Sequence, residues 1–273
     1  MTDSPRKTRT LIIGAARGPS SLVGALEATS HSVFVADPFG RNVSGDKHNV
    51  PGADVDLADR KDVFGVIERG IQELGGLDSF IFTAANDMAV MSGNGQPERY
   101  LSTDYWADVS QSLIYGGFYC TQAVLRHMVG AKGGRIIYVC ADGMVDGKGL
   151  DVPLTAASCS LLALSSSIAG SVFRNGMTVN AVIAGYPYAD LTEPVSPSNG
   201  SLREELAYSQ NARQRYQRDH RVYELETQHG LGWAESLMAF IRHLESVESS
   251  LINGSVFRLA NVGRESPLIR WTC

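Results

Sequence analysis

Short apolar runs alternate along the chain with longer segments that have a helical hydrophobic period. The runs have the length of buried strands and are Thr10–Ile13, Val33–Ala36, Ser79–Ala84, Arg135–Cys140, Thr178–Ile183 and Ser255–Leu259. The segments between them predict helices over Ser20–Thr29, Arg60–Leu74, Thr103–Val129, Pro153–Phe173 and Trp233–Glu245. This alternation predicts an α/β fold, a Rossmann-like doubly wound parallel sheet of six to seven strands with helices on both faces.

One polar segment, residues 186–230, interrupts the alternation. It begins with prolines and continues through the charged stretch REELAYSQNARQRYQRDHRVYELETQ. Because it follows a strand end, where ligands of open α/β sheets bind, it predicts a helical lid insertion over the ligand cleft. A solvated helical excursion without a role in binding is the alternative. We take the whole chain, residues 1–273, as a single domain that carries this insertion.

Composition narrows the classes of partner and of compartment. The chain has 273 residues, 44% of them hydrophobic, and a formal net charge of -5. Without a basic field we expect no nucleic acid partner. We find neither a signal peptide nor a stretch of membrane-spanning length, and expect a cytoplasmic protein without a membrane partner. The cysteines are scattered singly, which predicts reduced thiols and no metal site: Cys120, Cys140, Cys159 and Cys273.

The stretch LIIGAARGPSS follows the first predicted strand and opens the first helix. Gly14 and Gly18 permit a tight turn there, and the amides at a helix start form an anion site. Asp37 ends the second strand, where a carboxylate can hydrogen-bond an adenosine ribose. That carboxylate repels a 2′-phosphate and favours NAD over NADP, an inference that the nearby Arg17 and Arg41 soften. A plain turn residue is the alternative for Asp37.

In the order of its motifs the chain resembles the short-chain dehydrogenase/reductase family. GAARGPS is similar to the glycine turn of that family and VDLAD to the segment whose acidic residue contacts adenine. GGFYCTQAVLRHM is similar to its fourth helix, GGRIIYVCADG to its fifth strand, and LINGSVFRLANVG to its closing strand. The resemblance implies NAD as cofactor, held by Gly14, Arg17, Gly18, Ser20, Asp37, Asp56, Leu57 and Ala84.

The resemblance fails at the catalytic residues. Family members that transfer hydride are expected to use an Asn, a Ser, a Tyr and a Lys, and these fall here on Leu113, Ala141, Thr155 and Cys159. A Tyr acts as general acid and base only when a cation lowers its pKa, and a Thr and a Cys do not replace that pair. Pro19 also lacks the amide that the glycine turn aims at the pyrophosphate. The nicotinamide half of the site is therefore expected to be degraded.

Other polar residues are predicted to border the same cleft and to carry any remaining catalysis. Thr155 and Cys159 lie four residues apart on one helical face, and Asp142, Tyr186 and Asp190 follow predicted strands. A carboxylate in an apolar pocket has a raised pKa and can serve as acid or base in enolisation, dehydration or ring closure. Each of these residues is alternatively a solvated loop residue or, on the helix, a small side chain that permits close packing.

Three functions remain open, because function is decided by the site and not by the fold. The first, slightly favoured, is a non-redox enzyme of specialised metabolism, an isomerase, dehydratase or cyclase that acts on a small carbonyl or aromatic metabolite. The second is a catalytically silent subunit that pairs with an active homologue. The third is a residual NAD-dependent oxidoreductase. The resemblance implies assembly through the helices at 103–129 and 153–173, as a homodimer, a homotetramer or a hetero-oligomer with a related chain.

Overall fold

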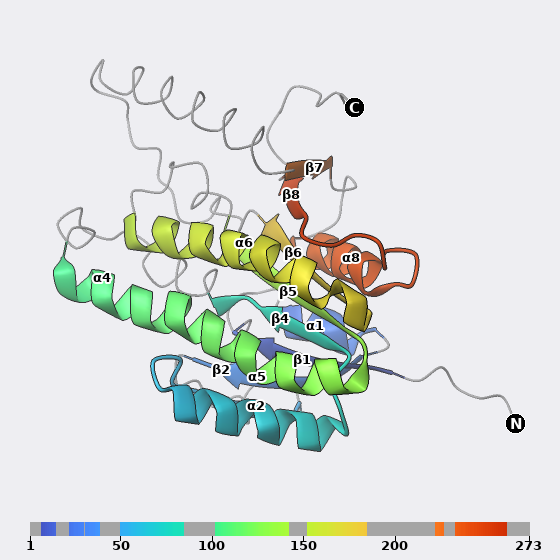
Figure 1. Ribbon diagram of the computed structural model, residues 1–273, viewed down its shortest axis with the longest axis horizontal. Coiled ribbons are helices and arrows are strands. Elements are labelled where there is room, and N and C mark those ends of the chain that lie inside the picture. The colour runs from blue at the N-terminus through green and yellow to red at the C-terminus, as the bar shows by residue number, and fades with distance from the viewer. Residues whose placement is uncertain are drawn as a thin grey trace, which may run out of the picture.

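The computed structural model describes residues 7–14, 22–29, 31–38, 50–84, 102–141, 152–184, 222–226 and 233–260 of the chain. These residues form an eight-stranded sheet in the order β3-β2-β1-β4-β5-β6-β8-β7, and every neighbouring pair is parallel. Figure 1 shows helices α2, α5 and α6 on one face of the sheet and helices α1 and α8 on the other. The predicted Rossmann-like, doubly wound α/β fold is confirmed.

Six of the eight strands match predicted ones. The strands are β1 (Thr8–Ile13), β2 (His31–Asp37), β3 (Gly52–Asp54), β4 (Ser79–Phe82), β5 (Gly134–Ala141), β6 (Met177–Ala184), β7 (Val222–Glu226) and β8 (Val256–Ala260). The two strands without a predicted counterpart, β3 and β7, form the two edges of the sheet. An edge strand is covered less completely than a central one, so its sequence carries less of the apolar signal.

The predicted helical lid is wrong at β7, which lies within residues 186–230. The five residues VYELE pair with β8 along their whole length, from Val222 opposite Val256 to Glu226 opposite Ala260. Tyr223 and Leu225 alternate there with Glu224 and Glu226, which is the period of a strand with one covered face. The rest of the predicted lid lies outside the described residues.

The helices also agree with the sequence pattern. They are α1 (Leu22–Glu27), α2 (Arg60–Leu74), α4 (Thr103–Val109), α5 (Gly116–Ala131), α6 (Val152–Val172) and α8 (Trp233–Glu245), with a 3-10 turn, η5 (Phe173–Asn175), after α6. A π-helical turn, η3 (Ser110–Tyr115), joins α4 and α5 into the one long helix that the sequence predicted. The carboxylate of Asp59 accepts the Lys61 N–H at the start of α2, and Gly75 ends that helix at a φ of 68°.

The sheet separates two apolar layers. In β1, Leu11 and Ile13 face the layer under α2, α5 and α6, while Ile12 faces the layer under α1 and α8. All three side chains are fully buried, as expected for a central parallel strand that is covered on both faces. Because helices cover both faces of the sheet, we expect a ligand to bind at the ends of the strands.

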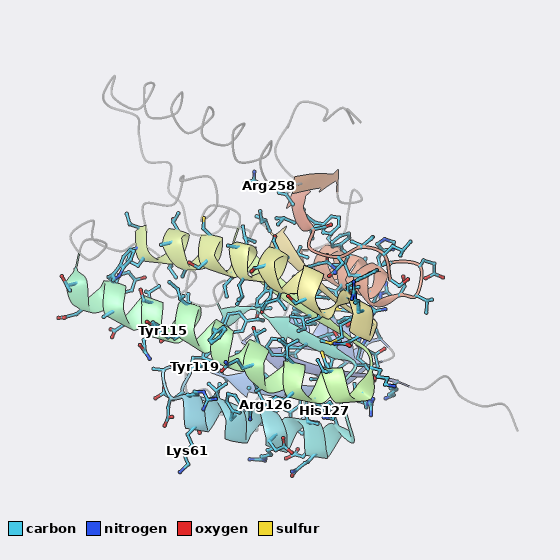
Figure 2. All side chains as sticks on the ribbon, viewed as in Figure 1. Lys61, Tyr115, Tyr119, Arg126, His127 and Arg258 are labelled. Carbon is cyan, nitrogen blue, oxygen red and sulfur yellow. The ribbon has the colours of Figure 1, made fainter. Side chains whose placement is uncertain are left out.

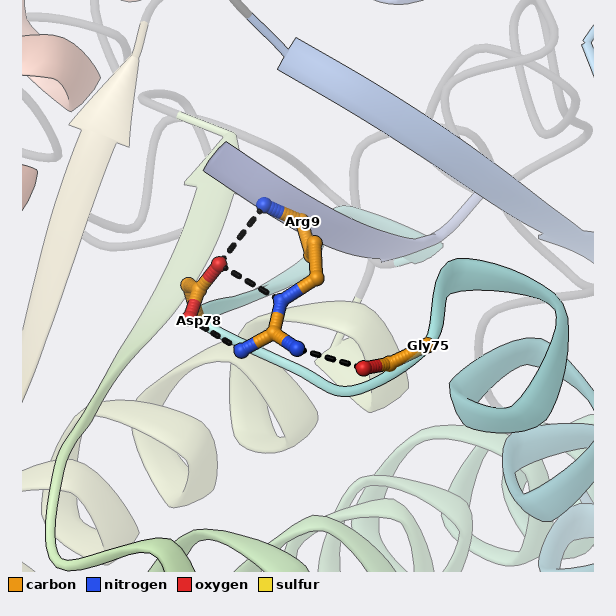
Figure 3. Close-up of polar contacts among 3 residues, drawn as sticks. All are labelled: Arg9, Gly75 and Asp78. Carbon is orange, nitrogen blue, oxygen red and sulfur yellow. Dashed lines mark hydrogen bonds and ion pairs between the residues drawn. The ribbon is translucent and has the colours of Figure 1, made fainter. Parts of the chain in front are cut away.

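An ion pair fixes the end of the sheet where the strands begin. The Nε of Arg9, in β1, donates to Oδ2 of Asp78 at 2.8 Å, and its Nη2 donates to Oδ1 at 2.7 Å (Figure 3). The hydrogen bonds that Arg9 donates to Asp78, together with the negative charge of that carboxylate, raise the pKa of Arg9. This bidentate pair joins β1 to the turn before β4 and leaves the opposite edge of the sheet for binding.

Helix α6 corrects the expectation that the chain has no stretch of membrane-spanning length. Together with η5 it covers Val152–Asn175, which is long and apolar enough to cross a membrane, with a mean hydropathy of 1.5. It packs on β5 and β6, and its Leu154, Leu161 and Leu162 are buried. A helix in the core of a domain passes the same test of length and composition.

Candidate nucleotide site

The carboxyl ends of the parallel strands meet at one edge of the sheet, which is where open α/β folds bind ligands. β1 ends there at Gly14, whose φ is 92° and whose N–H donates to the carbonyl of Ala36 in β2 at 2.9 Å. A side chain rarely tolerates this φ, so glycine permits the chain to leave the sheet at the predicted point. Its predicted companions Arg17, Gly18 and Ser20 lie outside the described residues.

Asp37 ends β2 at the same edge. Its side chain is fully buried, and its carbonyl accepts the Val55 N–H at 2.9 Å. Burying a carboxylate costs free energy unless donors or a ligand compensate it. A plain turn residue is expected to be exposed, so the burial favours the binding interpretation of Asp37 over that alternative.

Asp56 and Leu57 lie in the loop that follows β3. Asp56 is exposed, and its Oδ1 accepts the Ala58 N–H at 2.9 Å, which fixes the loop in a tight turn. Leu57 is buried against Gly116, where an added Cβ would lie 2.8 Å from the Leu57 Cβ. The two predicted residues are thus held beside the long helix that contains η3.

Ala84 lies just beyond β4 and is fully buried. The preceding Thr83 binds the end of β1 twice: its N–H donates to the carbonyl of Ile13 at 2.8 Å and its Oγ1 donates to the same oxygen at 3.1 Å. The ends of β1, β2 and β4, which carry Gly14, Asp37 and Ala84, therefore form one continuous edge.

The first turns of α6 lie beside the carboxyl end of β5. The Cys140 Sγ lies 3.9 Å from the Ser158 carbonyl oxygen, and Thr155 and Cys159 are half-buried on this part of the helix. Burial raises the pKa of the Cys159 thiol, and burial together with the nearby Cys159 raises the pKa of Cys140 to about 12. Both thiols are therefore protonated at neutral pH and are poor nucleophiles.

Leu113 lies in the π turn and faces the same region from the other side. It is fully buried in one apolar cluster with Leu154, Ala157 and Leu161 of α6. Ala141, the fourth of the aligned catalytic positions, ends β5 opposite Ala184. The crossing of η3 and α6 is thus packed with apolar side chains.

Thr121 of α5 and Tyr138 of β5 form a buried pair of hydroxyl groups. The Oγ1 of Thr121 donates to the Gly117 carbonyl at 2.6 Å and accepts a hydrogen bond from the Tyr138 hydroxyl. Burial raises the pKa of Tyr138, so its phenol stays protonated and serves as a donor. Pattern reasoning assigned Tyr138 only to a strand, and its packing between α5 and β5 gives it a structural role.

Arg258 is a buried charged residue that the sequence interpretation did not single out. It is buried in β8, in register with Ile183 of β6 and Glu224 of β7, and Figure 2 shows it where β8 meets β7. A buried guanidinium is costly unless an anionic partner compensates it. A charged residue within the apolar run VFRLA was the signal that could have identified it.

Several predicted site residues are not tested by this geometry. Asp142, Tyr186 and Asp190 lie outside the described residues, as does Cys273. The other three cysteines are free thiols. Within the part of the chain that the structure describes, no three His, Cys, Asp or Glu side chains gather as metal ligands would.

The described edge brings together four of the residues that were predicted to hold the adenosine end of NAD. Gly14 turns the chain out of β1, Asp37 is a buried carboxylate at the end of β2, and Leu57 and Ala84 are buried apolar residues beside them. At the other end, Thr155 and Cys159 offer no cation to a nicotinamide ribose. The fold is Rossmann-like, and this edge lies where open α/β folds bind ligands.

A sequence model of the short chain dehydrogenase family matches residues 28–200, well over half of the chain. The chain therefore belongs to the short-chain dehydrogenase/reductase family.

Relatives of known activity are dehydrogenases and reductases. The chain is 30% identical over 138 residues to the BbsD subunit of hydroxy(phenyl)methylsuccinyl-CoA dehydrogenase from Thauera aromatica, which covers 50% of this chain and 53% of the relative. It is 27% identical over 184 residues to the 3-oxoacyl-(acyl-carrier-protein) reductase FabG of Escherichia coli (strain K12), 67% of this chain and 69% of that one. The match to the first of these relatives thus spans only about half of its length.

The fold agrees with solved structures of the family. The crystal structure of levodione reductase superposes with a TM-score of 0.67 over 92% of this chain and 95% of that one, at 18% sequence identity. At this identity the likeness shows the fold alone.

Proposed function

We propose that this chain is a catalytically silent subunit that binds the adenosine end of NAD and pairs with a chain of the same fold that transfers hydride. The observation that carries the proposal is the crossing of η3 and α6. Leu113 is buried there among apolar side chains, and Thr155 and Cys159 offer a hydroxyl and a protonated thiol. None of these groups can exchange a proton with a substrate carbonyl near neutral pH.

The cofactor part of the proposal assigns two unequal halves to the site. This chain's residues would hold the adenosine end of bound NAD, and its nicotinamide end would meet no catalytic group at Leu113, Thr155 and Cys159. Asp37 accepts hydrogen bonds from the adenosine ribose, and the buried Leu57 and Ala84 exclude water beside the base. A carboxylate at this place disfavours a 2′-phosphate, so NAD binds in preference to NADP.

The pairing part of the proposal rests on the outer face of the long helix and α6. Trp106, Tyr115 and Phe118 are 44%, 52% and 43% exposed, which is unusual for large apolar side chains. Tyr115 and Phe118 line a groove of about 220 Å³ together with Ile114, Ser160, Leu161 and Leu164. Helix α6 has no charged residue over its 21 positions. Aromatic anchors beside an uncharged surface are typical of the core of a protein–protein interface.

An unlike partner is favoured over a second copy by two observations together. The face formed by the long helix and α6 offers a surface for a chain of the same fold. Because this chain lacks the catalytic residues, a partner that supplies the active site would be an unlike chain. The Thauera aromatica relative is likewise named as one subunit of a dehydrogenase. The non-redox enzyme favoured from the sequence depends on Asp142, Tyr186 and Asp190, which lie outside the described residues, and it stays a prediction.

Native mass spectrometry of the protein purified from its source tests the proposal. We expect an unlike subunit of similar mass, and no NADH oxidation with ketones by this chain alone. A homo-oligomer that turns over NADH would overturn the silent role, and a homo-oligomer that isomerises or dehydrates a metabolite would favour the non-redox enzyme.

A matched pair of variants tests the interface. Phe118→Glu places a charge in the groove, whereas Val129→Glu makes the same kind of change on the same helix at a side chain that is also 43% exposed. We expect only Phe118→Glu to dissociate the assembly in native mass spectrometry. Dissociation by both variants, or by neither, would contradict the assignment of this face.

A further inference from the structure

The π turn η3 contacts the loop that follows β3, which carries two of the predicted cofactor residues. The N–H of Gly116 donates to the carbonyl of Gln111, five residues earlier, which is the hydrogen bond of a π-helix. The side-chain amide of the same Gln111 donates to the Ala58 carbonyl at 3.3 Å. π turns inside α-helices are frequent at functional sites.

The loop at residues 56–58 is held from both of its sides. Within the loop, the Asp56 carboxylate accepts the Ala58 N–H at 2.9 Å. From α2, the Asp62 carboxylate accepts the Asp56 N–H at 2.7 Å. From the long helix, the Gln111 side-chain amide donates to the Ala58 carbonyl. The Gln111 amide therefore links the long helix to the loop that carries Asp56.

The close approach of the two elements is a property of the turn. A Cβ at Gly116 would lie 2.8 Å from both the Cβ and the carbonyl oxygen of Leu57, so only glycine lets the helix come this near. Without that approach the Gln111 side chain would not span the distance to Ala58. The residues that define the π turn are therefore the ones that touch the loop.

We propose that Gln111 is a positioning residue for the adenosine end of the site: from the π turn it holds the Ala58 carbonyl, and through it the loop that presents Asp56 and Leu57 to the ligand. This inference rests on the proposed binding of NAD through its adenosine end. It assigns to the helix that carries Leu113 a role in ligand binding that does not depend on hydride transfer.

Isothermal titration of the full chain with ADP-ribose tests the role of Gln111. Gln111→Met keeps the length of the side chain and removes the donor, and Gln122→Met makes the same exchange at a half-buried position of α5. The loss of one neutral hydrogen bond corresponds to a dissociation constant raised about three- to tenfold for Gln111→Met. We expect no change for Gln122→Met.

Hydrogen exchange at the loop adds a readout that needs no ligand. We expect the amides of Ala58 and Asp59 to exchange faster in Gln111→Met than in the wild type, at an unchanged melting temperature. A purely structural role would lower the melting temperature and leave the affinity of the folded protein unchanged. Equal ADP-ribose affinities of the wild type and Gln111→Met would overturn the positioning role alone, whereas a wild type that binds no ADP-ribose would overturn both this role and the proposed nucleotide binding.

Discussion

Substituting Gly116 by alanine tests whether the long helix and the loop after β3 are in contact as the structure places them. A methyl group at this position would lie 2.8 Å from the Cβ and from the carbonyl oxygen of Leu57. The carbonyl is backbone and its loop is held by the Asp56 turn, so it cannot move aside as the end of a flexible side chain would. The strain must be taken up by separation of the two elements.

The magnitude follows from two opposing effects. Replacing glycine by alanine inside a helix stabilises it by about 1 kcal/mol, and forcing an extra methyl group into a packed interior costs about 1–3 kcal/mol. Gly130→Ala is the matched control, because Gly130 lies in the same helix, α5, and has no atom within 4 Å of an added Cβ. The control gains only the stabilisation of the helix, without the cost of a packed methyl group. The free energies of unfolding of the two variants should therefore differ by about 1–3 kcal/mol, which corresponds to roughly 3–9 °C in melting temperature.

Thermal and urea unfolding of the two variants measure this difference, and ADP-ribose titration measures its effect on the site. We expect Gly116→Ala to unfold at the lower temperature and to bind ADP-ribose more weakly than Gly130→Ala. If Gly116→Ala is as stable as Gly130→Ala, the loop does not touch the helix, and the argument for Gln111 is refuted with it.

Three further predictions concern the rest of the chain. Glu245→Ala removes the buried partner of His31, whose Nε2 lies 2.9 Å from a Glu245 carboxylate oxygen, and should lower the free energy of unfolding by about 1.5–3 kcal/mol. The control Glu73→Ala removes the partner of Arg69 in an exposed pair and should lower it by less than about 1 kcal/mol. The double change Thr155→Tyr and Cys159→Lys should not restore NADH oxidation with simple ketones, and measurable oxidation would show that the loss is limited to this pair. Alkylation of Cys159 by iodoacetamide at pH 7 should be slower than that of an exposed cysteine, and its rate should rise as the pH approaches the raised pKa of Cys159. A fast reaction at neutral pH would contradict the burial of this thiol.

The fold was predictable because a central parallel strand must be apolar on both faces. β1, β4 and β6 are buried along most of their length, and the sequence shows them as continuous apolar runs. β7 lacks this signal because it lies at an edge and alternates charged with apolar residues. We expected a helix there from the charged residues around it, but the segment forms a strand because its backbone pairs with β8.

The backbone at two predicted site residues agrees with the sequence pattern, while their binding of a nucleotide stays a prediction. Gly14 has the positive φ that a turn out of β1 requires, and Asp37 ends β2 as the strand pattern indicated. Gln111 and Arg258 were missed because their importance comes from contacts between distant segments, α4–α5 with the loop after β3 and β8 with β7. A single sequence read for period and spacing carries no record of such contacts.

Packing explains some of the residues at the adenosine end and fails to explain Asp37. Gly116 and Leu57 would be retained for close packing alone, since each fills or permits a contact in the core. A fully buried carboxylate is different, because its desolvation opposes folding even when donors surround it. The burial of Asp37 is therefore the feature that favours a ligand over a purely structural edge.

Asp37→Asn separates these two accounts, with Asp54→Asn, its exposed register partner in β3, as the control. The amide has the same shape without the charge, so stability should hold within about 1 kcal/mol or rise. If the carboxylate binds the ribose through charge-assisted hydrogen bonds, the ADP-ribose dissociation constant should rise about 10- to 100-fold, which corresponds to about 1.5–3 kcal/mol. A large loss of stability with unchanged affinity would instead make Asp37 a structural residue, and the adenosine site would then have no charged group to hold its ligand among the residues that the structure describes at the ends of β1, β2 and β4.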